Sequence, residues 1–229
     1  MSHTKTTIQS FLIDEAQKIQ NQTMEDNDLT EILSTLNHII DIGEKVSEKE
    51  PKLSFYWNEI IAESISVIYA SLSGHNRLAL SGLRNILELS CHAFYYIDHL
   101  IELDLSINED LQADKYVSAL IRDDKFFTTA YIKTFNSQIL EFQKERDSVS
   151  NFLKKEYAGL CDIVHGRHKT LFKKEELSIK YSKPEFKRFE KEYIDLASSI
   201  AMMYVLRFED YSNAELNKLA MKRNIIKGL

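Results

Sequence analysis

The sequence has very few of the residues that interrupt helices. Only two prolines and six glycines occur in 229 residues, and a fold of many strands would need more of both for its turns. This scarcity predicts helices joined by short loops. The composition, 44% hydrophobic and 28% charged, is ordinary for a globular protein, and no repeat or linker-like segment divides the chain. We therefore expect one all-α domain over residues 1–229.

Long apolar runs and cysteine pairs are also missing. The longest uninterrupted apolar run, Ile200–Leu206, is far too short to cross a bilayer. The stretch MSHTKTTIQS at the N-terminus has neither the charged nor the apolar region of a signal peptide. These absences predict a cytoplasmic protein without a membrane partner. Cys91 and Cys161 lie in apolar-periodic segments and form no Cys-x-x-Cys pair, so we expect both to be reduced core residues.

The common catalytic motifs are absent as well. There is no Gly-x-x-x-x-Gly-Lys loop, Gly-x-Ser-x-Gly elbow, His-Glu-x-x-His or Gly-x-Gly-x-x-Gly, which leaves nucleotide hydrolases, α/β-hydrolases, zincins and dinucleotide-binding enzymes without support. The net charge of −6 and the lack of a recognition helix argue against duplex DNA as a partner. Cys161, His165 and His168 have helical metal spacing, but they supply only three ligands and Gly166 interrupts the helix,. We expect no metal and no cofactor.

Apolar residues at three- and four-residue steps predict a succession of amphipathic helices. Asp28 with Glu31, Ser182 with Pro184, and the SNAE of residues 212–215 are typical helix starts,. The helix over 76–102 would be about 40 Å long and is expected to be central. The expected helices cover residues 8–19, 28–46, 53–72, 76–102, 111–121, 126–143, 149–166 and 186–208, with a last short helix from 212.

These helices fall into consecutive groups along the chain. We expect N-terminal helices in residues 1–50, the bundle core in 53–165, a basic loop in 166–183 and C-terminal helices in 184–227. Residues 1–50 hold ten acidic and four basic side chains, whereas residues 166–191 hold nine basic and four acidic ones. The basic region is either a solvated loop and helix face or a surface that binds anions.

Two polar sets could carry chemistry. Along the 76–102 helix, Arg84 and Glu88 are the centre of a stripe that shares one face. This stripe is either solvent-exposed and structural or a functional face, and an arginine that precedes its glutamate is the weaker orientation for an intrahelical pair. The full stripe consists of Arg77, Ser81, Arg84, Glu88, Cys91 or His92, Tyr95 and His99.

The second set follows from EYAGLCDIVHGRHKTLF, residues 156–172. His165 falls at the expected end of a helix and directly before the basic stretch. A helix C-terminus can tune the pKa of such a ring, which could then meet a phosphate. The alternative is a histidine that only bonds the terminal carbonyls of its helix.

The pairing of LALSGLRNILELSCHAFYYI with the downstream YAGLCDIVHGRH resembles uncharacterised bacterial helical families related to the HEPN superfamily, whose members are often encoded with phage-defence and toxin systems. The resemblance covers about 50 residues in two blocks. It implies a helical bundle, commonly dimeric, that uses an arginine and a histidine to cleave RNA without metal. The superfamily's nuclease motif, an arginine followed after four to six residues by a histidine, does not occur in this sequence.

By this resemblance Arg84, Glu88 and His165 are the catalytic candidates, in a site assembled from two helices. His165 would take the proton of a ribose 2′-hydroxyl, Arg84 would stabilise the charge on the phosphate, and Glu88 would orient one of them. The RNA backbone would be held by basic side chains. The substrate-binding candidates are Arg77, Arg167, His168, Lys169, Lys173 and Lys174.

Two functions remain open at this point. One is a metal-independent ribonuclease effector of a bacterial defence or toxin system. The other is a non-catalytic helical module of such a system that binds a protein or a nucleotide. A homodimer is expected from the resemblance, and also from the surplus of aromatic residues in the helix over 186–211, because one core has limited room for Tyr193, Tyr204, Phe208 and Tyr211,.

Overall fold

The computed structural model describes residues 9–109, 117–123, 125–142, 145–164 and 180–229. These residues form helices and no β-strand, which confirms the all-α class. In chain order the elements are the π-helical turn η1 (Gln9–Asp14), α2 (Glu15–Asp26), α3 (Thr30–Lys49), the 3-10 turn η2 (Pro51–Leu53), α4 (Ser54–Leu72), α5 (Asn76–Asp98), α6 (Leu100–Glu109), α7 (Val117–Asp123), α8 (Thr129–Ile132), α9 (Ile139–Phe142), α10 (Ser148–Val164), α12 (Lys183–Phe208) and α13 (Ala214–Met221).

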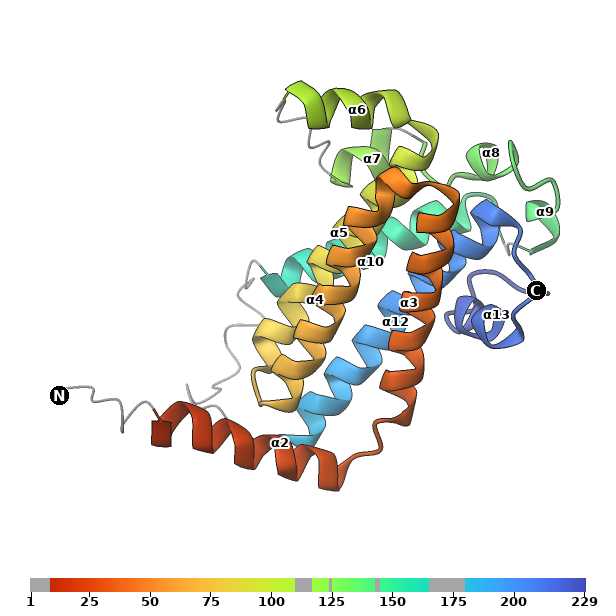
Figure 1. Cartoon of the computed structure of the whole chain (residues 1–229). Coiled ribbons are helices and arrows are strands. Elements are labelled where there is room, and N and C mark those ends of the chain that lie inside the picture. The colour runs from red at the N-terminus through yellow and green to blue at the C-terminus, as the bar shows by residue number, and fades with distance from the viewer. Residues whose placement is uncertain (1–8, 110–116, 124, 143–144, 165–179) are drawn as a thin grey trace.

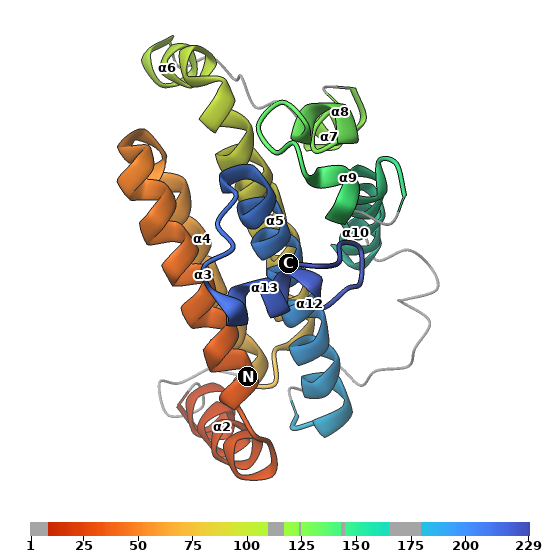
Figure 2. The same cartoon turned by 90° about the vertical axis from the view of Figure 1, so that its right-hand side faces the viewer.

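The longest of these helices, α3, α4, α5 and α12, lie side by side as a bundle (Figure 1). Helix α4 packs against α3 and α5, and α12 contacts the same two helices. Helix α10 adds a further neighbour to α5. Helix α2 lies across one end of the bundle, α6 and α7 lie at the other end, and α13 packs beside α12 (Figures 1 and 2). This arrangement places the candidate stripe of α5 beside α10.

Helix α12 is the most completely enclosed element. Every residue from Tyr193 to Leu206 is buried, including Asp195, Ser198 and Ser199, so this half of the helix is surrounded on all sides. Its aromatic side chains are absorbed by the core of a single chain. Tyr193 and Tyr204 are fully buried, while Phe208 and Tyr211 are half-buried against the core. One chain thus places these four side chains in or against its core, so they do not by themselves require a dimer, and the homodimer stays a prediction.

Several helix starts lie where the sequence predicts them. Pro184 occupies the first turn of α12, where a missing backbone N–H costs nothing. The Asn213 side chain accepts hydrogen bonds from the backbone N–H groups of Glu215 and Leu216, both at 3.1 Å, and so caps α13,. Asp28 accepts from the N–H of Thr30 at 2.9 Å and from its hydroxyl at 2.6 Å at the start of α3. Ser182 supplies only its backbone carbonyl, which accepts from Phe186.

The segment 76–102 is not one helix, because the chain leaves the helical conformation at His99. The ring Nδ1 of His99 lies 2.8 Å from the carbonyl oxygen of Tyr95, the group that a continuing helix would use for the backbone N–H of His99. That N–H bonds to Tyr96 instead, and the His99 ring stacks on Tyr95 with centroids 3.9 Å apart. Helix α5 therefore ends at Asp98, and α6 begins at Leu100.

The expected helix over 126–143 is also absent, and α8 and α9 stand in its place. Phe126 and Phe127 are both fully buried and lie in a turn before α8, where their rings pack edge to face with centroids 4.8 Å apart. Phe127 has a φ of 49°, which turns the chain, and the hydroxyl oxygen of Thr128 accepts from the N–H of Tyr131 to start α8. The left-handed backbone at Lys125 and Phe127 interrupts the predicted helix here.

One hydrophobic core cluster contains residues from Ile32 to Ile226. It joins the bundle, the α7 to α9 region and the segment after α13. Among the described helices, none combines the length and the apolar composition needed to cross a membrane.

Candidate functional site

Arg84 and Glu88 lie one turn apart near the middle of α5 and form an ion pair. The guanidinium Nε and Nη2 of Arg84 donate to Glu88 Oε1 at 3.1 and 2.9 Å. Their side chains are 23% and 27% exposed. The pair is therefore partly desolvated but still within reach of a solute.

Tyr157 of α10 completes this group, and the sequence analysis did not single it out. Its hydroxyl donates to Glu88 Oε1 at 2.9 Å and lies 3.3 Å from Nη2 of Arg84, from which it accepts. Its ring also lies under the guanidinium, with 5.6 Å from the Arg84 Cζ to the ring centroid,. A tyrosine within an apolar helical series needs a hydrogen-bond partner for its hydroxyl. This requirement was the signal in the sequence that could have identified Tyr157. We refer to Arg84, Glu88 and Tyr157 as the α5–α10 cluster.

The electrostatics of the cluster keep Tyr157 and Arg84 in their ordinary forms. Burial raises the pKa of Tyr157 to about 12, and the hydrogen bond to Glu88 acts in the same direction, so the phenol remains a proton donor at neutral pH. Burial acts to lower the pKa of Arg84, but the hydrogen bonds to Glu88 and Tyr157 outweigh it and the net shift is upward. The cluster thus holds a permanent cation beside an acceptor and a neutral hydroxyl.

The two cysteines differ in their surroundings. Both are free. Cys91 is fully buried below Glu88, and burial raises the pKa of its thiol. Cys161 is half-buried beside Tyr157 and contributes to the raised pKa of that phenol. Only Cys91 is a core residue, so the expectation is wrong for Cys161.

The rest of the α5 stripe divides among different surroundings. Arg77 is exposed, and its carbonyl accepts from the Ser81 hydroxyl at 2.8 Å. Tyr95 is buried and donates to Glu102 at 3.0 Å. His92 is half-buried near the rings of Tyr56 and Tyr96. The stripe is therefore not one continuous wet face, and Arg84 and Glu88 in its middle meet Tyr157 of α10.

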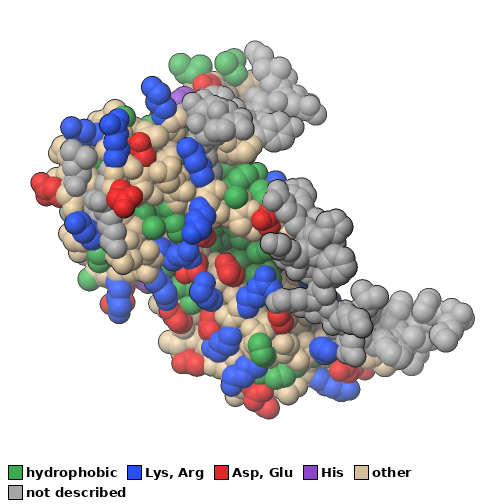
Figure 3. All heavy atoms as spheres, turned by 180° about the vertical axis from the view of Figure 1, so that it is seen from behind, with side chains coloured by type: hydrophobic (Ala, Val, Ile, Leu, Met, Phe, Trp, Pro, Cys, Tyr) green, Lys and Arg blue, Asp and Glu red, His purple; other side chains and the backbone are tan. Residues whose placement is uncertain are grey.

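Several candidates lie outside the described residues. Helix α10 ends at Val164, so the convergence of His165 with Arg84 remains a prediction. The same holds for the basic substrate-binding candidates Arg167, His168, Lys169, Lys173 and Lys174. On the face seen from behind, the described basic and acidic side chains intermingle (Figure 3).

No group of three or more metal-ligating side chains occurs within the described ranges. Of the three residues with helical metal spacing, only Cys161 belongs to those ranges.

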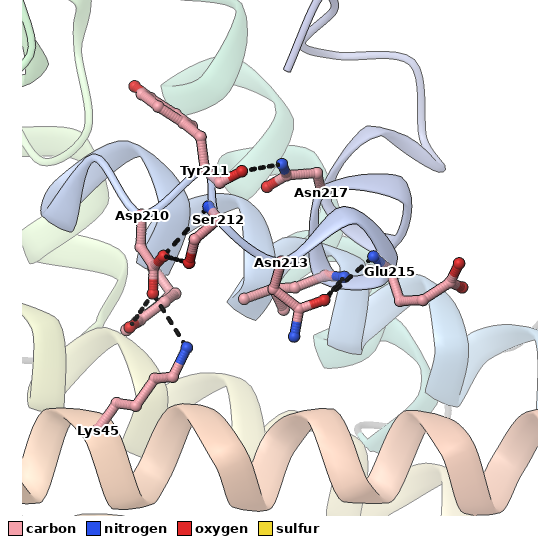
Figure 4. A network of polar contacts seen from close by, with 9 residues as sticks. Lys45, Asp210, Tyr211, Ser212, Asn213, Glu215 and Asn217 are labelled. Carbon is pink, nitrogen blue, oxygen red and sulfur yellow. Dashed lines mark hydrogen bonds and ion pairs between the residues drawn. The ribbon is translucent and has the colours of Figure 1, made fainter.

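A second polar network surrounds Asp210, at the turn between α12 and α13 (Figure 4). Its carboxylate accepts from the Ser212 hydroxyl at 2.6 Å, the Tyr204 hydroxyl at 2.8 Å and Lys45 Nζ of α3 at 3.1 Å. The hydrogen bonds of Ser212, Tyr204 and Lys45 hold the pKa of Asp210 far below its usual range, against the opposing effect of burial. Because every partner belongs to the chain itself, this network fixes the turn onto α3.

Comparisons with models of protein families, with curated proteins and with solved structures found no match for this chain. The geometry of the α5–α10 cluster therefore carries the functional argument. Among the described residues, the hydrogen bonds of Arg84 use Nε and Nη2. The planar guanidinium matches the geometry of carboxylate and phosphate groups.

Proposed function

We propose that this chain is a HEPN-like effector of a bacterial defence or toxin system that cleaves RNA without a metal ion. The observation that carries the proposal is the meeting of Arg84, Glu88 and Tyr157 between α5 and α10. Helix α5 contains the first block of the HEPN resemblance, and α10 contains the described part of the second, up to Val164. A cytoplasmic location and a homodimer belong to the same proposal. RNA would be its substrate, and the basic residues after α10 would hold the phosphate backbone.

The proposed reaction needs only groups that the chain can supply. His165 takes the proton of a ribose 2′-hydroxyl, and the resulting oxygen attacks the adjacent phosphorus. The bond from phosphorus to the 5′-oxygen of the next nucleotide breaks, which leaves a 2′,3′-cyclic phosphate and, after proton return, a 5′-hydroxyl. Arg84 stabilises the charge on the phosphate oxygens, and Tyr157 holds Glu88 so that the carboxylate orients the guanidinium. Arg84 is the catalytic residue of this group, and Glu88 and Tyr157 are positioning residues.

A non-catalytic module that binds a protein or a nucleotide is the second candidate. It is favoured by the two partners that Arg84 already has within the chain, because such a group can also lock α5 to α10,. In that case removal of any member lowers stability and no activity is lost.

Arg84→Ala and His165→Ala separate the two candidates. The purified variants are compared with the wild type for cleavage of a fluorescent single-stranded RNA in the presence of EDTA, and for melting temperature. We expect a loss of at least about 100-fold in cleavage rate for each variant, because one group supplies the base and the other the phosphate charge. The melting temperature should change little for His165→Ala.

Arg146→Ala is the matched control, because Arg146 is 87% exposed and its only described ion pair is a long contact of 3.8 Å to Asp147. It should cleave RNA as fast as the wild type. If the wild type does not cleave RNA and Arg84→Ala lowers the melting temperature strongly, the ribonuclease proposal is wrong. The cluster then has a scaffolding role between α5 and α10.

A further inference from the structure

The solvent-facing side of α4 carries almost no charge. Its exposed residues include one charged side chain, Glu59, beside Phe55, Asn58, Ala62, Ile65, Ser66 and Tyr69. Ile65 is 51% exposed and Tyr69 63%. The outer face of a surface helix normally carries charged residues, so this weakly charged outer face has no explanation within the described part of the chain.

The apolar surface continues onto α3. Gly43 of α3 lies against the side chains of Trp57 and Ile61 of α4, at 3.3 Å from a Cβ placed on the glycine. The two helices are joined by the short η2 and run antiparallel (Figure 1). Leu33 lies ten residues before Gly43 on α3, and Tyr69 lies about ten residues after the residues of α4 that contact Gly43. Because the two helices are antiparallel, Leu33 and Tyr69 lie at the same level along the helix axes. Leu33 is 52% exposed.

We call this surface the α3–α4 strip. It consists of the exposed Leu33, Phe55, Ile65 and Tyr69 together with the half-buried Leu36 and Ile61.

Acidic residues border the strip. Asp41, Glu44 and Glu48 are exposed on α3, and Glu59 is exposed on α4. None of these four carboxylates forms an ion pair with another described residue. Elsewhere near these helices acidic groups are paired, as with Asp104 and Lys52 at 2.8 Å. Among the described residues, the strip is thus an apolar surface with unpaired carboxylates along its edges.

We propose that the α3–α4 strip binds an amphipathic helix of a partner protein whose apolar face is bordered by lysine or arginine. A further helix can pack along two antiparallel helices as in any helical bundle, and helices of this kind are recognised through apolar anchors at steps of three and four residues. The acidic edges select the basic border, since opposite charges favour association and like charges oppose it. A second copy of this chain is the poorer occupant, because it would bring the same acidic edges together. This inference does not depend on ribonuclease activity.

The test uses the full chain and synthetic helical peptides of about 18 residues, long enough to span the strip. One peptide has leucines on one face and lysines beside them, a second has glutamates in place of the lysines, and a third scrambles the lysine peptide. Binding is measured by fluorescence anisotropy at low and moderate salt. We expect the lysine peptide to bind at least about 10-fold more tightly than either of the others, with an affinity that falls as salt rises.

Ile65→Lys should weaken binding of the lysine peptide at least about 10-fold, because it places a like charge in the centre of the apolar surface. Ile101→Lys is the matched control: Ile101 is an isoleucine on α6 that is 78% exposed and lies outside the strip. It should leave binding unchanged. Tyr69→Lys provides a second variant at an exposed position, and Glu44→Gln with Glu48→Gln should reduce the salt dependence.

The proposal is overturned if the scrambled peptide binds equally well, or if Ile65→Lys and Tyr69→Lys bind like the wild type. It is also overturned if Ile101→Lys loses binding to the same extent. Light scattering gives the remaining outcome: a wild-type dimer that Ile65→Lys converts to monomers would assign the strip to a second copy instead.

Discussion

Asp210 and Glu88 each collect several hydrogen-bond donors at one carboxylate. Glu88 is bound by a guanidinium and a phenol at a partly exposed position. Asp210 is bound by two hydroxyls and an ammonium group from α12, α3 and the turn itself. Charge-assisted hydrogen bonds of this kind are stronger than neutral ones. The two differ in what they join: the group at Glu88 lies between α5 and α10, which carry the HEPN-like segments, and the group at Asp210 ties the turn after α12 to α3.

Asp210→Asn should destabilise the protein in a pH-dependent way. The native pKa of Asp210 is far below its ordinary value, so the unfolded state binds more protons and the ionised carboxylate stabilises the fold above the unfolded pKa of about 4. That contribution is lost as the pH falls toward the native pKa. We expect the variant to lose about 1–2 kcal/mol of unfolding free energy at about pH 7.

Urea denaturation of both proteins at about pH 7 and about pH 3 measures this effect. The difference between them should shrink at the lower pH. A difference that stays constant between the two conditions would show that the charge of Asp210 has no role.

At the scale of elements, the contact between α4 and α5 depends on a glycine. A Cβ on Gly82 of α5 would lie 2.4 Å from Cγ1 of Val67 and 2.7 Å from Oε1 of Glu63, both on α4. Glycine weakens a helix interior by about 1 kcal/mol relative to alanine. This loss is offset here because the absent side chain allows the two helices to pack closely.

Gly82→Ala should therefore lower the unfolding free energy by about 1–3 kcal/mol, since Val67 lies within the packed core and must shift. Gly159→Ala is the opposite case, because a Cβ on Gly159 of α10 would meet nothing within 4 Å. It should raise the unfolding free energy by about 0.5–1 kcal/mol. Thermal unfolding followed by circular dichroism distinguishes the two. The packing argument is wrong if both variants shift the melting temperature in the same direction.

At the scale of the whole molecule, the segment after α13 connects α12 with α10 through Arg223. The guanidinium of Arg223 pairs with Asp195 of α12 and with Glu156 of α10 at 3.1 Å, and it lies 5.2 Å from the ring centroid of Phe152. Asp195 is buried, and Lys191 is its second partner at 2.9 Å. Arg223 thereby joins α10, the helix that carries Tyr157 of the α5–α10 cluster, to α12, the most buried helix of the core.

Arg223→Met should lower the unfolding free energy by about 2–3 kcal/mol. The apolar stem is kept, but the buried carboxylate of Asp195 loses its closest partner, and the cost stays below that of a fully unpaired charge because Lys191 remains. Lys218→Met is the control: the pair of Lys218 with Glu215 spans 3.8 Å between side chains that are 78% and 70% exposed, and it should contribute about 0–0.5 kcal/mol. Equal effects in urea denaturation would contradict the role of Arg223.

The sequence by itself determined the helical class and many of the helix boundaries. Pro184 and Asn213 mark the starts of α12 and α13 through their own backbone and side-chain chemistry, and such effects act within one helical turn. The burial of Cys91 follows in the same way from the apolar period of its segment,. These features are local, so the pattern of neighbouring residues is sufficient to predict them.

The tertiary structure decided what local patterns do not contain. A turn with positive φ at Phe127, whose ring lies in the core, interrupts one predicted helix, and the contact of His99 with the Tyr95 carbonyl divides another. Tyr157 meets Arg84 from 73 residues away in sequence, and only the packing of α10 on α5 sets which side chains face each other there. The apolar period of each helix states which face is buried but not which neighbour covers it, and that choice depends on packing between distant segments.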